Sequence, residues 1–486
     1  MKKYESGYIT CYLALTLGVM LSLIFTLFEA IRVQTIRTEA EGVMDVSLFS
    51  AFGEFHRELL NQYDLFFIDS SYGEGKPEIR KSEEHLQYYM NENFDRQRVE
   101  GVVGIRDLTG LHSDNVEFLE YIYATDAGGI ILKSQILDYM QLNKGIKILD
   151  KIKTTNKIIE VQKQQERDFD GEWDAAEERL QSLVEEKKKD FIDPETGEEI
   201  PIEFDNPANH IKAIKAQGTL GLVLGKENKI SSMIITPEYY YSHRTPRKGQ
   251  GEITIKESSL DQVTGKLLLN EYFMEKCSNY QTPMEKAVLK YQIEYLLHGK
   301  KSDLENLEAT VEDILWIRQG INFIHLLSDG TKQSEADTLA WLLSAVFLSP
   351  EIKDALKLTI LFAWNYAESV KDVRILMDGN KLPLQKTSEN WNTPLLQLFA
   401  FTSFLGEYKT SEEGLDYQNY LQFFLSLKKE EELLNKFADI CEMDIRVTDG
   451  NQYFQMDGCI YSVAAKANLS SNYGYGYEIT RKYRFE

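Results

Sequence analysis

The longest apolar stretch of the chain lies near its N-terminal end and contains no charged residue. It runs from Tyr8 to Phe28 and reads YITCYLALTLGVMLSLIFTLF. A helix of this length is about 30 Å long, which matches the hydrocarbon thickness of a lipid bilayer. The pattern therefore predicts a transmembrane helix.

Three other interpretations of this stretch compete with a permanent anchor. A cleaved secretory signal has an apolar core of about 7–15 residues followed by a small-x-small cleavage site. Here the apolar core is longer. The sequence FEAIRVQ at its end offers no convincing small-x-small cleavage site. A lipoprotein signal needs a cysteine after the core, whereas Cys11 lies near its start. A buried helix of a soluble domain is the third alternative, but the length and position favour an uncleaved signal anchor.

The charges that flank the apolar stretch indicate its orientation. Lys2 and Lys3 precede it closely, whereas Arg32 and Arg37 follow at a greater distance and are mixed with acidic residues. Because Lys and Arg are enriched on the cytoplasmic side, we expect the N-terminus inside the cell. The body of the protein is then extracellular.

The pattern after the anchor changes several times along the chain. Helical periodicity continues to about Leu60, and Tyr63–Ser71 and Val116–Thr125 read as strands of a small α+β unit. Charge-rich helical pattern resumes after Gly129 and is broken at Asp168–Gly171, which predicts an extended, coiled-coil-like helical hairpin. A segment rich in proline and glycine follows.

The second half of the chain is predicted to be helical and to end in strands. The candidate helices are Lys266–Lys276, Pro283–His298, Leu304–Leu327, Ser334–Leu348 and Ile352–Met377. The stretches DIRVTDG, QMDGCIYSVAAKANL and YEITRKYRF are separated by turn residues and predict a C-terminal antiparallel β-meander. The fold class is thus α+β, mostly helical. The expected segments are 1–7 (cytoplasmic leader), 8–28 (transmembrane signal anchor), 29–128 (membrane-proximal helix plus α+β unit), 129–192 (extended helical hairpin), 193–260 (irregular linker region), 261–440 (helical domain) and 441–486 (C-terminal β segment).

Composition narrows the class of protein. The chain has 486 residues, of which 43% are hydrophobic and 12% aromatic, so we expect folded domains rather than disorder. The net charge of -23 argues against a nucleic-acid partner, because phosphates require a Lys and Arg surface.

Motifs for catalysis, cofactors or metals are not found. The seven histidines form no HExxH or other paired spacing, and GxSxG and GxxxxGK[ST] do not occur. We therefore predict no catalytic residue, no cofactor, no metal site and no enzymatic activity. Cys441 and Cys459 flank an expected hairpin, so one prediction joins them in a disulfide and the other leaves them as buried thiols.

Two aromatic features could mark a binding surface. Trp364, Glu368 and Asp372 share one face of a predicted helix, with Arg374 nearby. They either line a groove or combine a core-facing tryptophan with a solvated acidic edge, and we expect the second arrangement. The three tyrosines Tyr239–Tyr241 would support extracellular binding of glycans or cell wall if they form an exposed stripe.

The N-terminal stretch SGYITCYLALTLGVMLSLIFTLFEAIRVQ resembles the anchors of the small pilin-like proteins of tight-adherence (Tad) pilus systems. Those anchors begin with Gly and a β-branched pair, corresponding here to Gly7 and Ile9-Thr10, and end at an acidic residue, here Glu29. The remainder is similar to an uncharacterised family of large single-pass exported proteins of Gram-positive anaerobes. Stretches such as EFHRELLNQYDLFFID, VEFLEYIYATDAGG, IRQGINFIHLLSD, AWNYAESVKDVRIL and CIYSV carry that similarity.

This resemblance implies a function in a Tad-like pilus or secretion system. Cleavage between Gly7 and Tyr8 would make the chain a processed, minor pilin-like component. However, Tyr12 stands where processed pilins have glutamate, which favours a permanently anchored assembly or accessory protein. Its partners would be the membrane and other membrane proteins of that machine. Glu29 and Arg32 either pair with a neighbouring anchor or simply mark the membrane interface. The alternative function is an extracellular surface protein that binds cell wall or glycans.

Overall fold

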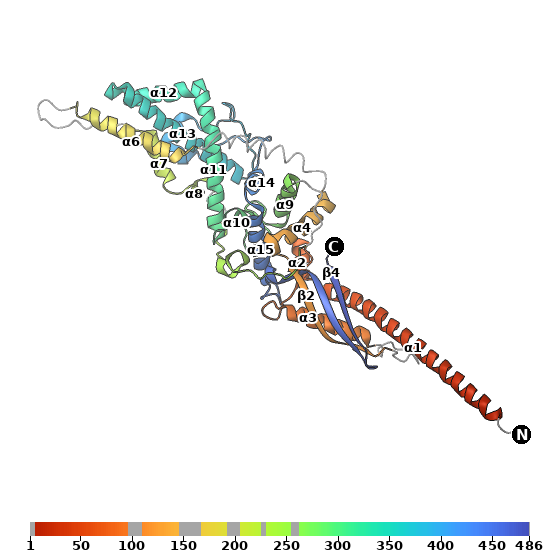
Figure 1. The fold of residues 1–486 in the computed structure, drawn as a ribbon. Helices are drawn as coiled ribbons and strands as arrows, with labels where there is room; N and C mark the ends of the chain where they lie inside the picture. Colours follow the sequence, from red (N-terminus) through yellow and green to blue (C-terminus); the bar gives the residue numbers. More distant parts are fainter. Residues whose placement is uncertain are drawn as a thin grey trace. The chain divides into compact units, whose positions relative to one another are not determined.

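The computed structural model confirms an α+β fold that is mostly helical, with a long apolar N-terminal helix and a small antiparallel sheet (Figure 1). The chain forms two compact units. Unit 1 comprises Met1–Tyr139, Glu238–Ser259 and Ala438–Glu486, and unit 2 comprises Met140–Pro237 and Leu260–Phe437. The structure describes residues 5–95, 109–144, 167–191, 205–224, 230–253 and 262–485.

Helix α1 (Glu5–Phe52) is one continuous helix with two different halves. As far as about Gln34 its side chains are almost all exposed, and most of them are apolar. In the second half one face is buried in the core of unit 1, and the spacing of its residues is helical: Ile36, Ala40, Met44, Leu48, Ala51 and Phe52. The predicted anchor therefore continues without a break into a core helix.

The sheet of unit 1 is organised around β3 (Cys459–Ser471). This strand pairs antiparallel with β2 (Leu111–Tyr123), with β4 (Gly476–Arg484) and, at its start, with the two-residue β1 (Ile68–Asp69). Alternate residues of β3, including Val463, Ala465 and Ala467, face the same core as α1. Helix α3 (Ile79–Phe94) completes this core with Leu86, Met90 and Phe94. The other elements of unit 1 are α2 (Arg57–Tyr63), most of α4 (Asp126–Lys144), η3 (Tyr241–His243), the end of α15 (Glu430–Arg446) and η6 (Met456–Gly458).

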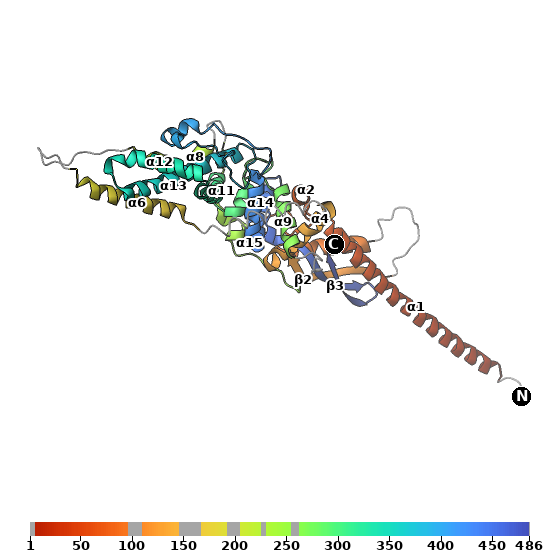
Figure 2. The ribbon, with the colours of Figure 1, turned by 90° about the horizontal axis from the view of Figure 1, so that it is seen from above.

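Unit 2 is built around α13 (Pro350–Met377), which is buried on almost every side along most of its length. Helices α6 (Phe169–Lys188), α11 (Asp303–Ser328) and α12 (Gly330–Ser344) pack along α13 (Figures 1 and 2). The other helices described are α7 (Pro207–Lys215), α8 (Leu220–Val223), α9 (Gln262–Lys276), α10 (Gln292–His298), η4 (Ala345–Phe347), η5 (Leu395–Phe404), α14 (Tyr417–Leu427) and the start of α15; η2 (Pro237–Tyr239) lies where unit 2 meets unit 1 in the sequence.

Several predicted elements differ from the structure. The first strand of the expected meander is wrong, because α15 continues to Arg446. Its apolar residues recur at helical spacing through Phe437, Cys441 and Ile445, so burial favours helix there. The sheet consists instead of the β3–β4 hairpin and the distant strands β2 and β1. The predicted helix over 283–298 is helical only in α10, and most of the predicted strand over 63–71 is not strand.

The predicted hairpin over 129–192 lies partly outside the described residues, since residues 145–166 are not among them. Of its two helices, α6 packs against α13, with Trp173 near Tyr366. Phe169 of α6 also packs against Phe323 of α11. The region 193–260, expected to be irregular, contains α7 and α8, and its residues from Glu238 onward belong to unit 1.

Candidate functional site

The exposed half of α1 fits a membrane anchor or a signal sequence by length and composition, and it is the one helix among the described residues that does. One side of it is made of small residues that recur every four positions: Ala14, Gly18, Ser22, Thr26 and Ala30. These residues line a groove along the helix. Small residues at this spacing allow two membrane helices to approach closely.

The predicted pair Glu29 and Arg32 lies where the exposed half of α1 ends. Arg32 Nη1 donates to Glu29 Oε1 at 2.9 Å, so the two side chains pair within one helix. The turn between β3 and β4 covers them, because the Tyr475 hydroxyl donates to Glu29 and the guanidinium of Arg32 lies over the ring of Tyr473. The pair therefore joins the anchor to the body of unit 1.

The other residues predicted to be sites lie apart from this pair. Gly7 and Tyr8 are in the first turns of α1, and the Tyr8 side chain is exposed. Cys441 and Cys459 are both buried and remain thiols, with no disulfide between them in the structure. Burial raises the pKa of the Cys459 thiol well above its ordinary value.

The three consecutive tyrosines do not form an exposed stripe. Tyr239 is exposed, Tyr240 is half-buried beneath the Arg446 guanidinium, and Tyr241 is buried. This arrangement removes the surface that would have supported glycan binding at Tyr239–Tyr241.

The segment after the tyrosines carries a buried ionic cluster in unit 1. Arg244 donates to Glu442 Oε2 at 2.7 Å and to Asp457 Oδ1 at 2.6 Å, and Arg446 also donates to Glu442 at 2.6 Å. Burial raises the pKa of Glu442 even though both arginines oppose that shift. Through these contacts the segment around Arg244 is held against the end of α15 and against η6.

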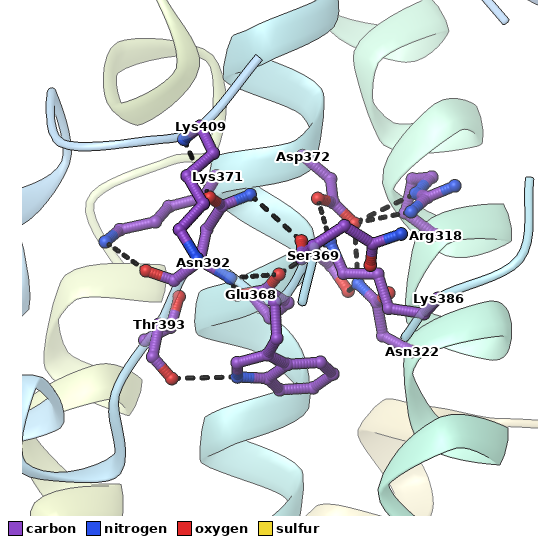
Figure 3. Close-up of polar contacts among 12 residues, drawn as sticks. Arg318, Asn322, Glu368, Ser369, Lys371, Asp372, Lys386, Asn392, Thr393 and Lys409 are labelled. Atoms are coloured by element: carbon purple, nitrogen blue, oxygen red, sulfur yellow. Dashed lines mark hydrogen bonds and ion pairs between the residues drawn. The ribbon is translucent and has the colours of Figure 1, made fainter. Parts of the chain in front are cut away.

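A second and larger polar cluster lies inside unit 2 (Figure 3). At its centre are Glu368 and Asp372, one turn apart on α13 and both fully buried. Arg318 of α11 donates to Asp372 Oδ2 through Nε at 3.0 Å and Nη2 at 2.7 Å. Lys386 Nζ lies 2.6 Å from Asp372 Oδ1 and 2.6 Å from Glu368 Oε1, so it bridges the two carboxylates.

Neutral groups complete this cluster. Asn322 Nδ2 donates to Asp372 Oδ2 at 2.9 Å, and the backbone N–H of Asn392 donates to Glu368 Oε1 at 2.9 Å. Burial raises the pKa of Asp372, but Arg318 and Lys386 lower it more strongly, so its pKa lies below the ordinary value. Asp372 is therefore held as an anion by groups from several segments.

The sequence prediction for this helix is half right. Trp364 faces the core, as expected, but the solvated acidic edge is wrong because Glu368 and Asp372 are buried. The cations that compensate them are remote in sequence: Arg318 lies 54 residues before Asp372, and Lys386 lies 14 residues after it. A pattern read along one helix contains no signal for such partners.

The contacts of the two clusters are those of buried ion pairs. Among the described residues, no group of three or more His, Cys, Asp and Glu side chains is arranged to hold a metal ion.

Comparison with known families matches residues 197–471 to DUF5702, a family of unknown function. The match covers more than half of the chain and includes the whole cluster around Asp372, but not α1. No curated protein and no solved structure matches the chain. The chain therefore belongs to the DUF5702 family of proteins of unknown function.

Proposed function

We propose that this protein is a non-enzymatic, single-pass membrane protein with an exported body. In this proposal it acts as an assembly or accessory component, or a minor pilin-like component, of a Tad-like pilus or secretion system. The observation that carries the proposal is the division of α1 into an exposed apolar half and a core-forming half.

The connection between the two halves supports a role in assembly. A flexible linker would leave the body free to turn about its anchor. Here the helix enters the core directly, and the contacts of Glu29 and Arg32 with Tyr475 and Tyr473 brace it just beyond the apolar stretch. Such a joint transmits the position of the anchor to unit 1.

The small-residue side of α1 supports a lateral partner in the membrane. Leucine-rich helices gain little by associating in lipid, whereas small residues allow close backbone contact. The groove from Ala14 to Ala30 offers this contact, and the resemblance to Tad anchors supports another membrane component of the same machine as the partner.

The test is site-specific photo-crosslinking from two positions of α1 in the native cell membrane. Ser22 lies on the small-residue side, and Met20 lies about 160° around the helix from it, because successive residues are about 100° apart. A crosslinker at Ser22 is expected to capture a pilus or secretion-system membrane protein, identified by mass spectrometry, and one at Met20 is not. Capture of lipid alone from both positions would contradict the proposed assembly function.

A further inference from the structure

Unit 2 has an open groove of about 1000 Å³ beside the ionic cluster. It is lined by α12, by Trp364 of α13, and by the segment from Ser388 to Leu396. Much of the lining is apolar, and Leu342 and Leu396 are strongly exposed. An exposed apolar groove of this size is costly to leave in water and is typical of a binding site.

One cation lies in the wall of this groove. The Lys332 side chain lines the groove, yet the residue is only 8% exposed. Its ammonium lies 4.8 Å from the centroid of the Trp364 ring and 4.4 Å from that of Trp391. Within the described part of the chain, no oxygen accepts a hydrogen bond from Nζ, and no carboxylate lies within ion-pair distance. A lysine ammonium has three N–H donors, and in Lys332 they are left for an acceptor in the groove.

The two tryptophans hold this ammonium in a fixed place. Both indole N–H groups donate to the carbonyl oxygen of Thr393, from Trp364 at 2.6 Å and from Trp391 at 2.8 Å. The rings are nearly perpendicular, with an interplanar angle of 84°. The Thr393 hydroxyl is buried without a hydrogen-bond partner, and this residue also lines the groove.

The nearby acidic groups do not neutralise Lys332. Asp329 caps the start of α12, where its Oδ1 accepts from the backbone N–H of Thr331 at 2.9 Å and its Oδ2 accepts from Ser388 at 2.6 Å. Glu335 lines the groove but is exposed to solvent, which screens its charge. Burial lowers the pKa of Lys332, which shows that these acids do not compensate for its removal from water.

The adjoining cluster adds further positive charge. It holds three cations (Arg318, Lys371 and Lys386) against two carboxylates (Glu368 and Asp372). Lys371 donates only to neutral oxygens, including the carbonyls of Asn392 at 3.2 Å and Glu407 at 3.2 Å. This cluster therefore holds one more cation than it has carboxylates, although the whole chain has a net charge of -23.

We propose that this groove binds an extended peptide segment of a partner protein in which an acidic side chain is flanked by apolar residues. The acidic side chain pairs with Lys332 against the tryptophan rings. The flanking apolar side chains cover Leu342 and Leu396. A groove of about 1000 Å³ that is open to solvent suits an extended chain better than a small acid, which would leave most of it empty. This inference does not depend on the anchor, because all of these residues belong to unit 2.

The test uses two dye-labelled probe peptides, acetyl-Leu-Leu-Glu-Leu-Leu-amide and the same peptide with Gln in place of Glu. Fluorescence anisotropy measures their binding to the full-length protein in lipid nanodiscs, with empty nanodiscs as the blank. We expect the Glu probe to bind at least about tenfold more tightly, because only the Glu side chain carries a charge that can pair with Lys332.

Three variants test whether Lys332 causes the preference for the Glu probe and whether the peptide binds in the groove. Lys332→Met is expected to abolish the preference for the Glu probe, whereas Lys301→Met, at an exposed lysine elsewhere in unit 2, leaves it unchanged. Leu396→Asp places a negative charge at a position that is 71% exposed, so the variant folds and is expected to bind the Glu probe at least about tenfold more weakly. Failure of the Glu probe to bind, equal binding of the two probes, or an unchanged preference in Lys332→Met would each overturn the proposal.

Discussion

The guanidinium of Arg32 lies over the ring of Tyr473, 4.2 Å from its centroid. This contact joins α1, just beyond its apolar half, to the turn between the last two strands. A cation over an aromatic face contributes about 0.5–1 kcal/mol at a partly exposed site. The contact therefore helps to orient the anchor against the sheet, while most of the stability of the joint comes from the buried half of α1.

A substitution at Met44 tests how much the buried half of α1 contributes to the stability of unit 1. Its side chain is fully buried in the core of unit 1, so Met44→Ala is expected to lower the free energy of unfolding by about 2–5 kcal/mol. Val46, on the same helix, is 53% exposed. Val46→Ala is therefore expected to change the free energy of unfolding by less than about 0.5 kcal/mol. Chemical denaturation of the full-length protein in detergent measures both. Equal effects would show that this half of α1 does not pack in the core.

Asp372 is expected to be essential for the stability of unit 2. Asp372→Asn leaves Arg318 and Lys386 without a full negative charge in a buried site, which costs about 3–5 kcal/mol. The matched control is Asp354→Asn, also on α13, whose side chain is 70% exposed. We expect the control to remain within about 0.5 kcal/mol of the wild type. Denaturation followed by tryptophan fluorescence distinguishes them, and a small effect of Asp372→Asn would refute the assignment of the cluster as a stabilising element.

Glu294 of α10 makes stability depend on pH. Burial raises its pKa from the ordinary value of 4.5 to about 7, although Tyr417 donates to its Oε1 at 2.6 Å. Between these two values the folded protein keeps a proton that the unfolded chain has released. The free energy of unfolding therefore falls as pH rises through this window, by up to about 3 kcal/mol.

Glu294→Gln is expected to remove this dependence, because the amide keeps an acceptor oxygen and does not ionise. Denaturation midpoints at pH 5 and pH 8 measure the slope, and Glu285→Gln at an exposed position serves as control. If the wild type and Glu294→Gln lose the same stability between the two pH values, another group is responsible.

The orientation across the membrane is tested by labelling single cysteines in intact cells. In a background with Cys11 replaced by Ser, the three remaining cysteines are buried. A membrane-impermeant maleimide is expected to label Glu389→Cys, at an exposed position in unit 2, without permeabilisation. Lys3→Cys is expected to react only after permeabilisation, and the reverse pattern would place the body in the cytoplasm.

The sequence predicts the parts of this fold that depend on local patterns. The apolar stretch from Tyr8 to Phe28, the long helices and the strand near the C-terminus are all encoded by periodicity and turn residues. Burial overrides local signals elsewhere: the DIRVTDG stretch has a strand-like pattern, yet Ile445 completes the apolar face of α15. The local sequence does not indicate that the start of this stretch is helical.

The buried ionic contacts could not have been predicted from one sequence. Asp372 and Glu368 look like an exposed acidic edge until Arg318 and Lys386 are brought to them by folding. The same is true of the groove, because Lys332 and Trp391 lie on different segments and form a site only after α12 packs on α13. Identifying such partners in advance requires knowledge of which helices pack together.

The central claim is that α1 is a retained anchor and at the same time a core element of unit 1. The most direct test is the intact mass and N-terminal sequence of the native protein extracted from membranes. We expect a mature chain that keeps residues 8–28, whether or not the bond between Gly7 and Tyr8 is cut. A mature chain that begins after Phe28 would contradict it, because the apolar half of α1 would then be a removed signal and the body a released protein.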